Sequence, residues 1–186
     1  MSRSPKSDHL APVEATGTGQ PAPVASTPCA RRYGPAGQVE SNSCREENDL
    51  ATASFAERLH LTDHWRTAHA FHSSLPGWLV ALPRRHVTSI AELTPAEAVE
   101  LGPLLHRLST ALHDVVRCAK TYVMQFAEAE GFGHVHFHVV PRMPDLPTEH
   151  RGPRVFHYLT RPESEWLTSD RRVEVAVAIA ERLRTG

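Results

Sequence analysis

The sequence carries almost no excess charge of either sign. Lysine and arginine together number 20 and aspartate and glutamate 21, so the formal net charge is -1 at pH 7. Proteins that bind the phosphate backbone of nucleic acids or an anionic membrane surface present a field of basic side chains. The balanced charge argues against both, and we expect neither nucleic acid nor membrane as a partner.

Long hydrophobic runs are also missing. No stretch reaches the roughly 18 apolar residues of a membrane span, and no apolar core of about seven residues precedes a cleavage site, as in a secretory signal. Residues 1–43 are rich in Pro, Ala, Gly, Ser and Thr and poor in large apolar side chains. Such a segment buries too little surface to offset its ordering entropy. We therefore expect a disordered tail over residues 1–43 and one domain over residues 44–186.

Cysteine is scarce. The chain has Cys29, Cys44 and Cys118, an odd number with no Cys-x-x-Cys pair. Disulfide frameworks are usually even and denser, so reduced thiols are the better interpretation. Reduced thiols are typical of the cytosol, and we expect a cytoplasmic protein.

Histidine, by contrast, is abundant, with 13 residues. Residues 134–140 are His-Val-His-Phe-His-Val-Val, an alternation that predicts a β-strand. Because successive side chains of a strand point to opposite faces, His134, His136 and His138 share one face and the intervening apolar residues share the other. The apolar face can pack into a core, which leaves the histidines for chemistry.

Three interpretations of this histidine row are open. Imidazole, with a pKa of about 6.5, can act near neutrality as nucleophile, base or acid. Alternatively the row is ordinary polar decoration of an exposed strand, or two of the histidines chelate a divalent metal. Histidine fills every polar position, which argues against decoration, and a closed zinc site needs about four ligands, more than one flat strand supplies. We favour a catalytic row.

The remaining pattern predicts an α+β domain. Strands are predicted at residues 64–71, 77–82, 120–126 and 134–140. Helices are predicted from the Thr94 cap to Val116, over residues 170–184 and, more sparsely patterned, over residues 46–60. Thr94 with Glu97 forms a capping box, and Pro95 suits the first helical position. We expect an antiparallel sheet with helices on one face, the longer helix covering the apolar face of the histidine strand.

The run His134-x-His136-x-His138-x-x, with apolar residues at each x and Pro-Arg after it, resembles the signature of the histidine triad (HIT) superfamily of nucleotide hydrolases and transferases. The likeness covers roughly residues 61–142 and is similar to that of bacterial HIT-domain hydrolases such as the diadenosine tetraphosphate hydrolases. It implies the HIT-like fold, an antiparallel sheet of about five strands with two main helices. It also implies a small-molecule nucleotide substrate and a homodimer.

The resemblance also implies a mechanism. His136 would attack the α-phosphorus of a nucleoside phosphate, dinucleoside polyphosphate or phosphoramidate, giving a covalent nucleotidyl-histidine that water cleaves. His138 would donate to a phosphate or bridging oxygen and protonate the departing group. His134 would help fix the tautomer of His136. This scheme requires no metal or other cofactor.

Substrate-binding candidates lie on both sides of the triad, and some positions depart from the family. Gln125 aligns with a glutamine that contacts substrate phosphate in some members, and Arg142 is a candidate phosphate clamp. Trp78, also a candidate, replaces a histidine that helps orient the nucleophile. Ala70 replaces the Asp or Asn that holds the ribose, and Gly131 replaces a Ser or Thr. These changes leave an alternative, a non-catalytic nucleotide-binding or metal-binding module that has kept the triad.

Two further groups of histidines bear on metal binding and on the substrate pocket. Many bacterial members bind a structural zinc through Cys-x-x-Cys and downstream histidines, but the matching residues 41–44 are Ser-Asn-Ser-Cys. Serine is a poor zinc ligand, so we expect no metal, and a weakened site of Cys44, His86 and His134 is the alternative that stays open. His69 and His72, near the Pro-Gly turn at residues 76–77, are candidate pocket residues, although polar residues at a sheet edge are the plainer interpretation.

Overall fold

The computed structural model describes residues 51–186. The predicted tail over residues 1–43, which contains Cys29, lies outside the described residues. Cys44 also lies outside them. The predicted helix over residues 46–60 is wrong in its described part. That part contains only a 3-10 turn, η1 (Phe55–Glu57), and the start of the two-residue strand β1 (His60–Leu61).

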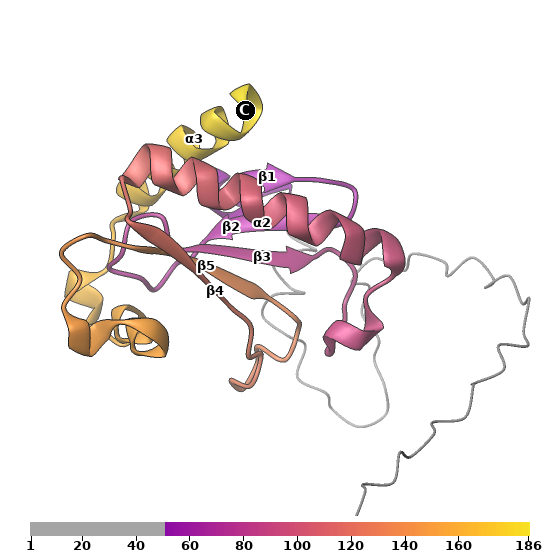
Figure 1. Cartoon of the computed structure of the whole chain (residues 1–186), viewed down its shortest axis with the longest axis horizontal. Coiled ribbons are helices and arrows are strands. Elements are labelled where there is room, and N and C mark those ends of the chain that lie inside the picture. The colour runs from indigo at the N-terminus through magenta and orange to yellow at the C-terminus, as the bar shows by residue number, and fades with distance from the viewer. Residues whose placement is uncertain (1–50) are drawn as a thin grey trace, which may run out of the picture.

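A five-stranded antiparallel sheet forms the base of the fold (Figure 1). The strands run in the spatial order β1-β2-β3-β5-β4. After β1 they are β2 (Trp65–His69), β3 (Leu79–Pro83), β4 (Lys120–Met124) and β5 (Phe137–Arg142). The predicted α+β class and strand number are confirmed, while β5 starts later than the predicted strand over residues 134–140.

The strand register decides which side chains share a face. His138 of β5 is paired with Val80 of β3 on one side and with Met124 of β4 on the other. Directly paired residues of antiparallel strands point to the same face. His138, Val80 and Met124 therefore lie on one face, which we call the triad face, and Val139 and Leu79 lie on the other.

Helix α2 (Pro95–Val116) covers the face opposite the triad (Figure 1). Its start is fixed by the predicted capping box, in which Thr94 accepts from the Glu97 backbone N–H and the Glu97 side chain accepts from the Thr94 N–H. The buried residues of α2 join strand residues in one hydrophobic core, whose members include Leu104, Leu108, Leu112, Val135, Phe137 and Val139. The prediction that the helix packs on the apolar side of the histidine strand is confirmed.

The second long helix, α3 (Ser169–Thr185), packs beside α2. Its N-cap is Thr168, whose hydroxyl accepts from the Arg171 N–H. Val175 and Ile179 join the same core, and Arg182 pairs with Asp114 of α2 at 2.6 Å. No helix within residues 51–186 combines the length and apolar character needed to cross a membrane.

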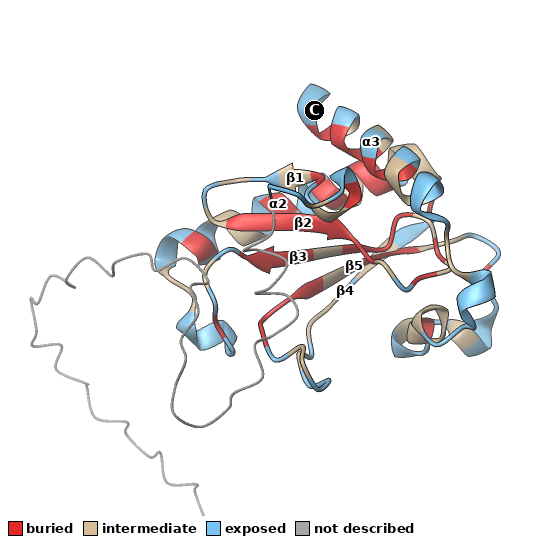
Figure 2. Ribbon diagram, turned by 180° about the vertical axis from the view of Figure 1, so that it is seen from behind, coloured by how far each residue is buried: buried red, intermediate tan, exposed pale blue. Residues whose placement is uncertain are grey.

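A second, smaller core lies on the triad face. It joins Ala70, Leu75, Trp78, Val140, Leu146 and Val155, with Phe156 packed against it. Val155 and Phe156 belong to the 3-10 segment η4 (Gly152–Leu159), which follows η3 (Thr148–His150). Figure 2 shows the sheet from behind, with its buried central strands in red. The triad face is thus partly covered by the segment that follows β5.

Candidate active site

His136 lies immediately before β5 with an unprotonated nitrogen available. Its Nδ1 is 2.8 Å from the backbone carbonyl oxygen of His134. A carbonyl oxygen only accepts, so Nδ1 must carry the proton and donate it. In the neutral ring the Nε2 lone pair is then unprotonated, as a nucleophile requires. The residue is largely buried, with 9% of its surface exposed.

His138 has the opposite tautomer. The indole Nε1–H of Trp78 donates to Nδ1 of His138 across 3.1 Å. Indole nitrogen is a donor only, so Nδ1 must accept and the neutral ring carries its proton on Nε2. Burial, with the nearby charge of His136 as the smaller cause, lowers the pKa of His138 to about 4. His138 is therefore a neutral hydrogen-bond donor near pH 7.

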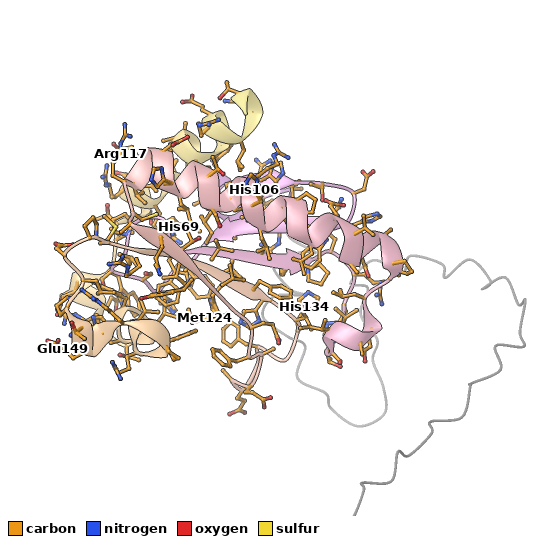
Figure 3. All side chains as sticks on the ribbon, viewed as in Figure 1. His69, His106, Arg117, Met124, His134 and Glu149 are labelled. Carbon is orange, nitrogen blue, oxygen red and sulfur yellow. The ribbon has the colours of Figure 1, made fainter. Side chains whose placement is uncertain are left out.

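His134 is locked into the backbone. Its Nε2 donates to the carbonyl of Pro83 at 2.9 Å, and its Nδ1 accepts from the Val87 N–H at 3.3 Å. Burial lowers its pKa to about 4. Both bonds tie the chain before β5 to the end of β3, which places the carbonyl that orients His136 (His134 is labelled in Figure 3).

The rings of His136 and His138 are direct neighbours. Their centroids are 4.8 Å apart and their planes are nearly perpendicular, at 84°. One ring offers a lone pair at Nε2 and the other an N–H at Nε2. This pair of tautomers can attack an electrophilic centre and at the same time donate a hydrogen bond to an oxygen on it.

Trp78, which the sequence suggested as a substrate-binding residue, lies beneath His138 and not on the surface. Its side chain is completely buried. The indole meets the His138 ring edge-on at 5.7 Å and the Phe156 ring at 5.3 Å. Its contact in the site is therefore with His138.

Gln125 and Arg142 are placed differently from each other. Gln125 is half-buried and directly follows Met124, the β4 residue paired with His138. Arg142 is the last residue of β5, paired with Lys120. At about 3.3 Å per residue, its Cα lies roughly 20 Å along the strand from that of His136. Gln125 is therefore one residue beyond the strand partner of His138, whereas Arg142 is separated from the nucleophile along β5.

His69 and His72 do not join the triad. His69 is paired with Leu79 and shares the helix-covered face, and Figure 3 shows it far from His134. Its Nε2 accepts from the Gly77 N–H at 2.9 Å, and burial lowers its pKa to about 4. His72 is exposed and stacks on Trp166, with centroids 4.2 Å apart. His69 is a buried structural residue on an inner strand, so it is neither a pocket residue of the triad nor a polar residue at a sheet edge.

Phe156 is a site residue that the sequence did not reveal. Its ring lies 5.0 Å from that of His138 and 5.7 Å from that of Phe126, whose side chain is exposed. Phe156 belongs to η4, a short segment whose apolar residues do not by themselves tell which surface they cover.

The described residues do not assemble a metal site. His86 and His134 approach to 3.2 Å between their Nδ1 atoms, and their rings stack at 5.1 Å. No cluster of at least three His, Cys, Asp or Glu side chains suited to a metal occurs within residues 51–186. Two imidazoles fall short of the four ligands of structural zinc.

Solved structures with the same architecture are histidine triad proteins. A HIT-like protein of Bartonella henselae is 17% identical, with 76% of this chain and 96% of that chain covered and a TM-score of 0.57. A zinc-bound histidine triad family protein of Mycobacterium smegmatis is 14% identical, with coverage of 75% and 91% and a TM-score of 0.53. The chain has the histidine triad fold.

A third HIT-fold structure carries an enzyme name. The diadenosine triphosphate hydrolase of Plasmodium falciparum, solved with cyclomarin A, is 14% identical, with coverage of 72% and 80% and a TM-score of 0.53. No protein-family model matches the sequence. At these identities the HIT proteins establish the fold of this chain, and its chemistry has to be argued from its own residues.

Proposed function

We propose that this HIT-fold protein is a nucleotide hydrolase or nucleotidyltransferase that acts on the α-phosphate of a nucleoside phosphate or dinucleoside polyphosphate. The observation that carries the proposal is the 2.8 Å bond from His136 Nδ1 to the His134 carbonyl. This bond leaves Nε2 of His136 unprotonated beside the N–H of His138. A nucleophile next to a hydrogen-bond donor is the arrangement that phosphoryl displacement needs.

The first step forms a covalent intermediate. Nε2 of His136 attacks the α-phosphorus, and the bond from phosphorus to the leaving oxygen breaks with its electron pair on that oxygen. The ring then carries positive charge, which the carbonyl of His134 stabilises through Nδ1–H. Water next attacks phosphorus, the nitrogen–phosphorus bond breaks, and the pair returns to His136. The products are a nucleotide, the leaving group and a proton.

The proposed roles of the other residues follow from their placement. His138 donates from Nε2 to a phosphate oxygen, and this hydrogen bond is strongest when charge accumulates on that oxygen. Gln125 is proposed to donate its amide to another phosphate oxygen. Arg142 lies too far along β5 for the clamp that its sequence position favoured.

Mass spectrometry of the trapped intermediate tests the proposal. The protein is mixed with diadenosine tetraphosphate, quenched in base and digested, and the peptide containing residues 134–140 is analysed. We expect a nucleotidyl adduct on His136 and none in His136→Asn, with the matched variant His72→Asn labelled like the wild type. Protection by ligand without an adduct would instead support the non-catalytic binding module.

Assembly and location remain predictions. Strand β4 is at the edge of the sheet, and Val123 and Phe126 expose 45% and 53% of their surface there. We propose that a second copy covers this edge in a homodimer. Light scattering should give twice the mass of the chain, and Val123→Lys should lower it to one chain. The proposed cytoplasmic location rests on the small, odd number of cysteines in the sequence.

A further inference from the structure

The hydrogen bond from Trp78 to His138 constrains more than the direction of a ring. Trp78 is completely buried, and the planes of its indole and of the imidazole are nearly perpendicular, at 89°. In this geometry the indole N–H points at the Nδ1 lone pair across 3.1 Å. The nitrogen that would receive a second proton is already occupied by a donor that cannot accept one.

We propose that Trp78 is a positioning residue that holds His138 as a neutral Nε2–H donor, and that the site consequently cleaves bonds whose leaving groups depart as anions, such as phosphoric anhydrides, in preference to phosphoramidates. The proposal rests on the proposed function above. It concerns the departing group and the protonation of His138, which the covalent step on His136 does not determine.

The surroundings of His138 oppose a second proton. Val80 and Met124 flank it on the neighbouring strands, and Phe156 of η4 lies edge-on at 5.0 Å. None of these side chains can carry charge. The described group whose charge acts on His138 is His136, which is repulsive when protonated, and burial is the larger cause that lowers the pKa of His138. A cationic His138 would also face the Trp78 N–H with a second N–H.

The proton balance then separates the two substrate classes. In an anhydride, the phosphorus–oxygen bond breaks with its electron pair on a phosphate oxygen, which is stable as an anion and requires no proton. In a phosphoramidate the pair is left on nitrogen, which must be protonated to leave. Neutral His138 could supply that proton only by becoming an imidazolate in apolar surroundings, which is strongly unfavourable. His138 therefore stabilises charge without giving its proton away.

Substitution of the two buried tryptophans tests the proposal. In Trp78→Phe the ring is kept and the N–H is lost. The matched control is Trp65→Phe, which removes an equally buried indole whose N–H donates to the Glu97 carbonyl at 3.0 Å on the other face. Both variants are assayed with diadenosine tetraphosphate and with adenosine phosphoramidate between about pH 5 and pH 8, and kcat/KM is corrected for the folded fraction.

We expect the wild type to prefer the anhydride by about 10²-fold or more, the usual contribution of a general acid. Burial of His138 persists in Trp78→Phe, but Nδ1 is no longer occupied by the indole N–H, so the fraction of His138 that carries a second proton should rise at low pH. The preference should then shrink by roughly tenfold, and phosphoramidate cleavage should rise toward low pH. Trp65→Phe should keep the wild-type preference. Equal use of both substrates by the wild type, or an unchanged ratio and pH profile in Trp78→Phe, would overturn the proposal.

Nitrogen-15 NMR of the wild type gives a test that is independent of turnover. The Nδ1 resonance of His138 should stay that of an unprotonated ring nitrogen from about pH 7 to pH 5. A protonated Nδ1 within this range would overturn the role of Trp78 even if Trp78→Phe failed to fold. Turnover of neither substrate would overturn the proposed function and the leaving-group preference, while this spectrum would still show whether Nδ1 of His138 stays unprotonated beside Trp78.

Discussion

Two buried tryptophans, one on each face of the sheet, show how the partner decides what a hydrogen bond does. Trp65 donates to the backbone carbonyl of Glu97 at 3.0 Å and thereby ties β2 to helix α2. Trp78 donates to His138 at 3.1 Å. Both side chains are completely buried. The carbonyl has no proton to gain, so the first bond is structural, whereas the imidazole has one, so the second bond also sets a protonation state.

The same contrast extends to the two faces as wholes. The helix-covered face is closed by α2 and α3 around one continuous core. The triad face has a smaller core around Trp78, Val155 and their neighbours, and the Trp78 ring of this core contacts His138 edge-on. We therefore expect substitutions on the first face to change stability and substitutions on the second to change chemistry.

The largest effect should come from the nucleophile. Replacing His136 by Ala removes the attacking nitrogen, so kcat/KM for diadenosine tetraphosphate should fall by about 10⁴-fold or more. The urea midpoint should stay near that of the wild type, because the side chain contributes one hydrogen bond, to a carbonyl two residues away. Retention of more than a few per cent of activity would show that another group attacks phosphorus.

A deletion in the helix-covered core should have the complementary effect. Leu108 is completely buried on α2, and Leu108→Ala should lower the free energy of unfolding by about 2–5 kcal/mol. Urea unfolding measures this loss. The kcat/KM per folded molecule should be unchanged, and a specific loss of activity would contradict the separation of the two faces.

Acid should destabilise both faces through their buried histidines. The pKa values of His69, His134 and His138 are lowered from 6.5 to about 4, mainly by burial. Between these values the unfolded chain binds more protons than the folded one, so stability is lost as the pH falls through this window. Each histidine should cost about 2 kcal/mol at about pH 5.

The variant His69→Gln measures how much of the stability lost in acid comes from the histidine on the helix-covered face. Glutamine does not titrate, and its carbonyl oxygen can still accept a hydrogen bond. Urea unfolding at about pH 7.5 and pH 5 should therefore show a smaller difference for the variant than for the wild type. An equal difference would mean that His69 does not contribute to the acid loss.

The smallest effect should come from a glycine of α2. A Cβ added at Gly102 meets no atom within 4 Å, so Gly102→Ala should stabilise the protein by about 0.5–1 kcal/mol. The control of opposite sign is Gly77→Ala. Gly77 has a φ of 82°, and its added Cβ would lie 2.9 Å from Leu112 Cδ2. Thermal unfolding of the pair measures both shifts, and equal signs would contradict this account of Gly77.

Local sequence patterns predicted the fold because its elements are locally encoded. The Thr94 capping box fixed the start of α2, and the alternation at residues 134–140 fixed which side chains face the helix. Strand β5 starts only at Phe137 because its pairing with the neighbouring strands begins there. The last residue of β3 that pairs with β5 is Ala81, opposite Phe137, and the last residue of β4 that pairs with it is Met124, opposite His138. The end of a ladder depends on the neighbouring strands, which a single segment does not contain.

The site was predictable only in its central residues. His134, His136 and His138 are close in sequence and share a pattern, but the Trp78 bond joins residues 60 apart, and the Phe156 contact depends on how η4 folds back. Arg142 illustrates the opposite error. It follows the triad closely in sequence, yet each residue of an extended strand moves the chain about 3.3 Å further from His136.

The stereochemistry at phosphorus tests the central claim most directly, since each in-line displacement inverts the configuration. An isotopically chiral α-phosphorothioate substrate, cleaved in isotopically labelled water, reports the number of displacements. Attack by His136 followed by attack by water gives two inversions, so the account predicts net retention. Net inversion would mean that water attacks the substrate directly and would contradict a covalent intermediate on His136.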